Sequence, residues 1–372
     1  MKIGVPCEIK NNEYRVGLVP ASVRELTLRG HEVFIEHAAG EGIDFSDAEY
    51  EAAGAKILPN AKLVFETAEM IVKVKEPQAV ERAMLQEHHT LFTYLHLAPD
   101  PAQTEDLVKS GATCIAYETV TDSRGRLPLL APMSEVAGRL SIQAGAWCLE
   151  KARGGSGKLL GGVPGVAPAK VMILGGGVVG FNACQMAIGL GARVVVLDRN
   201  IDVMRYLDAT FENRIETAFS NAHAIEHHLQ SADLIIGGVL IPGAAAPKLV
   251  RREHLSTMIS KSVLVDVAID QGGCFETSRP TTHAEPTYIV DDIVHYCVAN
   301  MPGAVPRTST FALNNATLPF ALALADKGPK QAMLDDPHLL EGLNVHNGMV
   351  TYEDVARDLG YDYVPAKAAL KQ

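Results

Sequence analysis

Four polar side chains that could do chemistry each follow an apolar run typical of a buried strand. Arg15 lies in the loop after the first run, and its planar guanidinium suits a carboxylate. Lys75 and His96 end two further runs, and Asp270 follows another one much later in the chain. An imidazole titrates near neutral pH, which suits it to proton transfer. These residue types predict a site that holds a small anion and moves protons.

Each of these residues, taken alone, has a simpler interpretation. A surface cation, or a histidine with satisfied hydrogen bonds, is the common state of such residues in proteins. The carboxyl ends of parallel strands meet at one edge of a sheet, so Arg15, Lys75 and His96 are expected to converge there. Their shared placement favours a site over three unrelated residues.

A glycine-rich turn in the middle of the chain predicts a dinucleotide site. Gly175, Gly177 and Gly180 follow the apolar run 171–174 and open a helical segment. The three glycines allow a tight turn, a close approach of the backbone to a pyrophosphate and close helix packing, and the helix N-terminus favours an anion. Asp198 ends the next apolar strand, where a carboxylate can accept hydrogen bonds from ribose hydroxyls.

The choice between NAD and NADP depends on two neighbouring residues. Asp198 would repel a 2′-phosphate, which favours NAD. Arg199 could instead pair with such a phosphate, so use of both cofactors stays open. The sequence therefore predicts NAD, with tolerance of NADP as the alternative.

Other polar residues have competing interpretations. Asp266 lies nearer the strand body than Asp270, which favours a structural hydrogen-bond acceptor. Asn300 lies in a turn-rich segment that could line the nicotinamide pocket or serve as a hinge. His223 and His227 have a spacing that can chelate a metal, but no third ligand is nearby, which favours a solvated helix face and no metal.

Composition narrows the class of protein. The chain has 372 residues, 47% of them apolar, and 33 basic against 44 acidic residues give a net charge of −11. This charge opposes binding to nucleic acid or to an anionic membrane. No uninterrupted apolar run approaches the length that spans a bilayer, and the chain opens directly on a strand pattern without a signal peptide. We therefore expect a cytoplasmic protein.

Strand and helix patterns alternate along the chain, which predicts α/β architecture. Strands are expected at 2–6, 32–36, 70–75, 90–95, 113–118, 171–174, 194–197, 233–236, 262–267 and 287–290. Helices are expected at 20–29, 77–87, 101–110, 132–151 and 308–326. The tail after 326 shows only short helical patterns and is too short for a core of its own.

These patterns predict two doubly wound domains linked by long helices. A Rossmann domain for NAD, residues 131–306, is inserted in a discontinuous, Rossmann-like substrate domain formed by 1–130 and 307–372. The nicotinamide is expected to project from the carboxyl ends of its strands toward the substrate groups of the first domain.

The chain resembles the alanine dehydrogenase family, which is related to the alpha subunit of nicotinamide nucleotide transhydrogenase. The resemblance runs from end to end. It is most specific in the stretches 11–15, 73–77, 95–98, 129–139, 161–168, 266–274 and 300–303. The transhydrogenase branch lacks the catalytic histidine, whereas this chain has His96.

The resemblance implies an NAD-dependent oxidoreductase that converts L-alanine reversibly to pyruvate and ammonium. It implies that Arg15 and Lys75 bind substrate, that His96 and Asp270 carry proton chemistry, and that the enzyme is a homohexamer. Besides the glycines and Asp198, it assigns cofactor contacts to Ser134, Val178, Ser220, Val239, Leu240, Val267, Asp270, Val298, Asn300 and Met301.

Two alternatives remain at this stage. One is a transhydrogenase-like subunit that passes hydride to a membrane partner, and the other is an NAD-binding sensor without catalysis. A sensor would need no proton shuttle, so the presence of Arg15, Lys75, His96 and Asp270 favours the enzyme.

Overall fold

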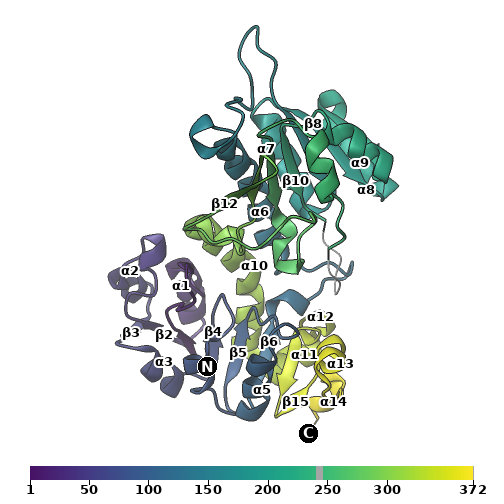
Figure 1. Cartoon of the computed structure of the whole chain (residues 1–372). Coiled ribbons are helices and arrows are strands. Elements are labelled where there is room, and N and C mark those ends of the chain that lie inside the picture. The colour runs from purple at the N-terminus through teal and green to yellow at the C-terminus, as the bar shows by residue number, and fades with distance from the viewer. Residues whose placement is uncertain (240–245, 372) are drawn as a thin grey trace. The chain divides into compact units, whose positions relative to one another are not determined.

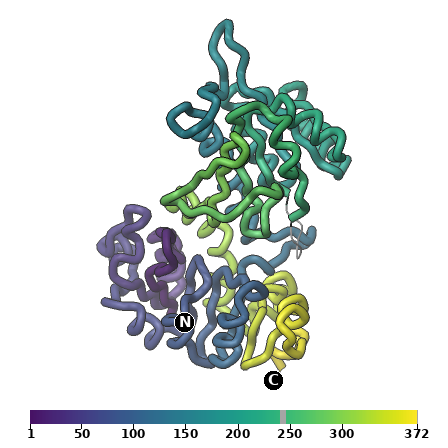
Figure 2. The backbone as a smooth tube through the Cα atoms, viewed as in Figure 1, coloured from purple at the N-terminus to yellow at the C-terminus, as the bar shows by residue number. Residues whose placement is uncertain are grey.

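The computed structural model describes residues 1–239 and 246–371. The chain forms two compact units, and each is described by itself. Unit 1 comprises Met1–Met133 and Val305–Gln372, and unit 2 comprises Ser134–Ala304. Figures 1 and 2 trace the chain from one end to the other. Within the described residues, every helix is too short or too polar to cross a bilayer.

Unit 1 is built on an eight-stranded sheet with the order β15-β14-β6-β5-β4-β1-β2-β3. The strands β1 to β6 run parallel, and β14 and β15 are antiparallel additions at one edge. Their bounds are β1 Lys2–Val5, β2 Glu32–Glu36, β3 Lys56–Leu58, β4 Met70–Val72, β5 Thr90–Thr93, β6 Thr113–Ala116, β14 Leu343–His346 and β15 Met349–Val350.

Helices flank this sheet, as Figure 1 shows. They are α1 Pro20–Leu28, α2 Asp47–Ala52, α3 Ala61–Thr67, α4 Ala79–Arg82, α5 Pro101–Ser110, α10 Pro306–Lys327, α11 Pro329–Asp335, α12 Pro337–Leu340, α13 Glu353–Leu359 and α14 Ala366–Ala369, with 3-10 turns η1 Glu41–Ile43 and η2 Tyr117–Thr119. Proline opens α1, α5, α10, α11 and α12, where its missing N–H costs nothing.

Unit 2 contains a seven-stranded sheet with the order β12-β13-β11-β10-β7-β8-β9. All strands are parallel except the edge strand β12, which pairs antiparallel with β13. The bounds are β7 Lys170–Leu174, β8 Arg193–Asp198, β9 Ile215–Phe219, β10 Leu234–Gly237, β11 Val263–Asp266, β12 Thr287–Val290 and β13 Ile293–Tyr296.

The first helix of the middle of the chain is α6 Ala131–Cys148. Its first residues belong to the first segment of unit 1, which ends at Met133, and the rest belong to unit 2. The other helical elements are α7 Val178–Gly189, α8 Ile201–Phe211, α9 Ala222–Leu229, η3 Lys151–Arg153, η4 Glu212–Arg214, η5 Arg252–Thr257, η6 Val267–Gln271 and η7 Met301–Ala304. The fold class expected from the sequence, two α/β units with one inserted in the other, is confirmed.

The central strands of both sheets are buried on both faces. All residues of β5, β6, β10 and β11 are buried, as expected for parallel strands covered by helices. Separate apolar clusters lie in the two units: Ile71, Leu91 and Val345 belong to one, and Met172 and Ile235 to the other.

The helix expected at 77–87 was wrong in length, because only Ala79–Arg82 is helical. The first turn is held by a capping box between Gln78 and Glu81, and the chain then turns so that Leu85 joins the core of unit 1. The backbone N–H of Gln86 donates to the ring of His89 instead of continuing the helix. The strand expected at 70–75 also ends earlier, at Val72.

The tail holds strands that the helical reading of the sequence missed. β14 pairs antiparallel with β6, and β15 pairs with β14, so the tail extends the sheet of unit 1. The turn between them is Asn347-Gly348, with φ of 47° and 80°. The dipeptide Asn-Gly is the strongest short hairpin signal, because both residues tolerate positive φ. This dipeptide could be read from the sequence.

Candidate active site

The predicted substrate residues of unit 1 follow strands that are neighbours in the sheet. The order β6-β5-β4-β1 brings the loops after these four strands to one edge. Lys75 follows β4 and His96 follows β5, while Arg15 lies in the loop between β1 and α1. The loop after β6 adds Glu118, which the sequence reading did not select. The strand order therefore places the loops that carry these residues at one edge of the sheet of unit 1.

His96 sits on a turn with unusual backbone geometry. Its φ is +52°, in the left-handed region that few residues other than glycine adopt. The carboxylate of Glu118 accepts the N–H of His96 at 2.6 Å and the N–H of Leu95 at 3.1 Å. The same carboxylate lies 3.3 Å from Nδ1 of His96, and the ring stacks on Tyr94.

The charges around His96 favour its protonated form. Burial lowers the pKa of the imidazole, but the charge and hydrogen bond of Glu118 raise it more, so the pKa lies above its ordinary value. The positive charge of Lys75 lowers the pKa of His96, which places the two predicted residues within electrostatic reach. The ring is thus surrounded by protein atoms that desolvate it, while 41% of the side-chain surface stays exposed and open to a ligand.

Arg15 is held by a residue two positions before it. Its Nε donates to Glu13 at 2.7 Å and its Nη2 donates to the other carboxylate oxygen at 2.6 Å. Nη1 lies 3.0 Å from the sulfur of Met133. Both charged side chains are almost fully buried. The guanidinium is therefore oriented by a bidentate pair, which the sequence reading had not foreseen.

A second buried charge cluster lies beside Lys75. The ammonium of Lys73 is 3.1 Å from Glu8 and 2.7 Å from Glu81, and all three side chains are at most 2% exposed. Glu8 also accepts the N–H of Val74 at 2.6 Å. Burial raises the pKa of Glu8 more than Lys73 lowers it. This cluster fixes the chain that leads into Lys75.

In unit 2 the glycine turn has the shape that a dinucleotide needs. Gly175 has φ +92°, and a side chain at Gly180 would overlap the carbonyl oxygen of Gly175. Gly177 caps α7, and a methyl group there would meet no atom within 4 Å. Gly175 is thus required by its backbone conformation and Gly180 by packing, while Gly177 leaves open space before a helix N-terminus.

Asp198 is tied to this turn. One carboxylate oxygen accepts the N–H of Gly176 at 2.6 Å, and the other accepts the N–H of Asn200 at 2.7 Å. The side chain is partly exposed at the end of β8, and Arg199 beside it is exposed. A carboxylate oriented by backbone N–H groups at this position fits the ribose role.

The two acids after β11 have different environments. Asp266 is fully buried and accepts hydrogen bonds from the backbone of Cys274 and Phe275 and from the hydroxyl of Ser278. Burial raises its pKa, although these hydrogen bonds oppose the shift. Asp270 is exposed on η6. The structural interpretation of Asp266 is confirmed, and Asp270 is the acid that a ligand can reach.

The remaining predicted cofactor residues lie mostly after strands of unit 2. Ser220 follows β9, Val239 follows β10, Val267 follows β11, and Val298 and Asn300 follow β13, whereas Ser134 lies on α6, Val178 begins α7 and Met301 begins η7. Val298 and Met301 are buried, and Val178 is 45% exposed. Leu240 lies outside the described residues.

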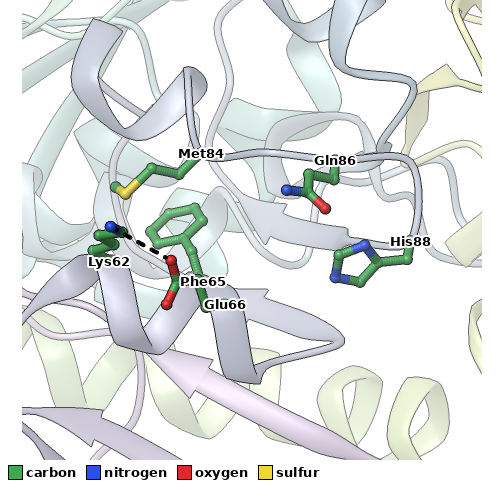
Figure 3. Close-up of a pocket in the computed structure, with 6 residues that line it drawn as sticks. All are labelled: Lys62, Phe65, Glu66, Met84, Gln86 and His88. Carbon is green, nitrogen blue, oxygen red and sulfur yellow. Dashed lines mark ion pairs between the residues drawn. The ribbon is translucent and has the colours of Figure 1, made fainter.

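A surface pocket of about 380 Å³ lies in unit 1 (Figure 3). Its lining is Lys62, Phe65, Glu66, Met84, Gln86 and His88. None of the predicted site residues lines it. Among residues 1–239 and 246–371, His, Cys, Asp and Glu side chains form no group of three or more that could hold a metal.

Comparisons with known proteins cover the chain. The family model "Alanine dehydrogenase/PNT, N-terminal domain" matches residues 4–137, and "Alanine dehydrogenase/PNT, C-terminal domain" matches 141–353. Alanine dehydrogenases of Halomonas elongata and Methanococcus maripaludis are 62% and 56% identical, each covering 100% of both chains. A solved L-alanine dehydrogenase superposes with a TM-score of 0.94 at 53% identity, over 97% of this chain and 99% of that one.

Proposed function

The chain belongs to the alanine dehydrogenase/PNT family, and from this premise we propose how its residues carry out the reaction. It is an amino-acid dehydrogenase with a nicotinamide cofactor, and its reaction interconverts L-alanine with pyruvate and ammonium. The observation that supports the residue roles best is the placement of Lys75 and His96 after neighbouring strands, within electrostatic reach of each other.

In this proposal, Arg15 and Lys75 bind the substrate. The guanidinium of Arg15 is buried and paired with Glu13 in this structure, and the proposed role requires it to bind the substrate carboxylate in addition to Glu13 or in its place. Lys75 is directed at the reacting centre, where its ammonium polarises the carbonyl of pyruvate in the reductive direction. The positive charges favour a bound anion in a chain whose net charge is −11.

His96 and Asp270 handle protons and developing charge. When bound, the nicotinamide supplies the acceptor for the hydride that leaves the α-carbon. His96 exchanges protons as water adds to the iminium and as the carbinolamine collapses to pyruvate and ammonium. Asp270, exposed on η6, is proposed to stabilise positive charge that develops on the substrate nitrogen.

NAD is the proposed cofactor. The open space at Gly177, the N-terminus of α7 and the oriented carboxylate of Asp198 suit a pyrophosphate and an unphosphorylated ribose. Arg199, which can pair with a 2′-phosphate, is the feature that would let the same site accept NADP. Kinetics with both cofactors test this choice, and a lower specificity constant for NAD would overturn it.

The assembly proposed from the family resemblance is a cytoplasmic homohexamer. Six chains of 39.9 kDa give a mass of about 239 kDa. Light scattering on the purified protein measures this mass directly, and a monodisperse species of one or two chains would contradict the proposal.

One assay tests the function against its alternatives. Purified protein is mixed with pyruvate, ammonium and NADH, and the absorbance of the reduced nicotinamide is followed. The proposed enzyme consumes NADH only when both pyruvate and ammonium are present. A sensor binds NADH without consuming it, and a transhydrogenase-like subunit needs a second nucleotide in place of the keto acid.

A further inference from the structure

The turn that carries His96 needs support from its surroundings. A non-glycine residue at φ +52° is held in a sparsely populated region, and such geometry persists only where neighbours impose it. The turn comes directly after β5, between the buried residues Leu95 and Leu97. The support must therefore come from groups that contact this backbone.

Two side chains from other elements hold the turn. Glu118 of η2 accepts the N–H groups of Leu95 and His96 through the same oxygen, Oε1, at 3.1 and 2.6 Å. Gln103 of α5 is fully buried, and its amide donates to the carbonyl of Leu95 at 2.5 Å. The backbone is thus bound on its donor side and on its acceptor side.

The ring of His96 is oriented by the same carboxylate. Nδ1 lies 3.3 Å from Oε1 of Glu118, and the ring is stacked on Tyr94 with centroids 5.8 Å apart and planes 23° from parallel. Tyr94 is itself anchored, because its hydroxyl donates to the carbonyl of Leu129 at 2.5 Å. With Nδ1 directed at a fixed carboxylate, the ring presents Nε2 away from Glu118.

We propose that Glu118 is the positioning residue of His96. Its carboxylate fixes the left-handed turn and binds Nδ1, so that Nε2 is the nitrogen that exchanges protons with the substrate. This inference rests on the proposed function, since it gives a partner to the histidine assigned there. In the neutral form of His96, the ring then carries its proton on Nδ1.

The charged groups near His96 determine what loss of Glu118 would do. Glu118 and Glu76 raise the pKa of the imidazole, while burial and Lys75 lower it. Without the charge of Glu118, burial and the ammonium of Lys75 both lower the pKa of His96. The imidazole should then lose its proton at lower pH.

The test uses Glu118→Gln, whose amide oxygen can still accept the two backbone N–H groups. The pH profile of kcat/KM for L-alanine is expected to move down by about one pH unit or more, with KM for pyruvate within about twofold of wild type. Glu105→Gln is the matched control, because Glu105 is a 58% exposed carboxylate on α5 paired with Lys109. Its profile should match wild type.

A second measurement is independent of activity. In ¹⁵N-histidine spectra, assigned to His96 with a His96→Asn variant, the neutral ring should carry its proton on Nδ1 and should titrate at lower pH in Glu118→Gln. The opposite tautomer, or an unchanged titration in Glu118→Gln, would overturn the proposal. An inactive wild type that shows the expected spectra would instead refute the proposed function and support the role of Glu118.

Discussion

At the residue scale, the proposed chemistry depends on the imidazole of His96 and on the charges that surround it. His96→Ala should lower turnover by roughly a hundredfold or more, because a general acid–base group is lost. Cofactor binding should be nearly unchanged, since the predicted dinucleotide residues lie in the other unit. His96→Asn is the matched variant, because asparagine tolerates positive φ. Turnover equal to wild type in both variants would remove His96 from the mechanism.

The raised pKa of His96 also predicts opposite pH dependences for the two reaction directions. Oxidation of L-alanine needs the neutral base, so its kcat/KM should rise with pH through a pKa above the ordinary value of 6.5. Reduction of pyruvate needs the acid form and should decline over the same range. Steady-state rates in both directions between pH 6 and 9 check this, and parallel profiles would contradict it.

The ion pair of His96 and Glu118 also makes the stability of the fold depend on pH. Because the folded pKa of His96 is raised, its stabilising contribution is present below the unfolded value and is lost as pH rises through the folded pKa. Burial raises the pKa of Glu118, but the charge and hydrogen bond of His96 lower it by more, so the folded pKa lies below the ordinary value. The stabilising contribution of Glu118 is therefore lost as pH falls through its folded pKa. The ion pair therefore stabilises the fold most between the two titrations.

The buried Lys73 makes a separate prediction at this scale. Lys73→Met leaves Glu8 and Glu81 buried without their cation, which should lower the free energy of unfolding by about 3–5 kcal/mol near neutral pH. The loss should shrink in acid, where the carboxyl groups are protonated. Lys62→Met is the control, because Lys62 is 75% exposed and should change stability by less than about 0.5 kcal/mol. Equal denaturation midpoints for the two variants would argue against the buried cluster.

At the scale of elements, the junction between β7 and α7 separates a packing role from a ligand role. Gly180→Ala should lower the free energy of unfolding by about 1–3 kcal/mol or more, because its methyl group overlaps the Gly175 carbonyl. Gly177→Ala should leave the thermal midpoint almost unchanged, since no atom lies within 4 Å. It should nevertheless weaken NADH binding by about tenfold or more, because the backbone must approach a pyrophosphate there. Normal NADH affinity in Gly177→Ala would place the dinucleotide elsewhere.

At the scale of the whole molecule, the chain forms two compact units, and the proposal assigns a different task to each. The proposed substrate residues belong to unit 1, and the proposed cofactor residues described here belong to unit 2. NADH at about a hundred times its Kd should stabilise the protein by about 2.7 kcal/mol. Hydrogen exchange with NADH alone should slow in the segment 175–180 and around Asp198. Hydrogen-exchange rates in this segment that do not change when NADH is added would contradict the assignment of the dinucleotide to unit 2.

Local patterns were enough for the fold class and for the main elements. The apolar run 171–174, the three glycines and Asp198 are a continuous signal, because each residue acts through its own backbone or its near neighbours. The general behaviour of parallel sheets then predicted that residues after the strands share one edge, and the strand order itself came from the structure. The strands β14 and β15 were missed because the tail was interpreted from its short helical patterns, and the hairpin signal of Asn347-Gly348 was not used.

The tertiary structure decided which charges meet. Glu118 lies 22 residues from His96, and Glu8 lies 65 residues from Lys73, so no spacing rule could pair them. Glu13 is only two residues from Arg15, yet its bidentate contact depends on the folded course of the loop. By itself the sequence determined the α/β fold class, and it predicted a dinucleotide turn and residues for acid–base chemistry. Only the fold decided their partners, because a side-chain contact depends on where distant strands end in space.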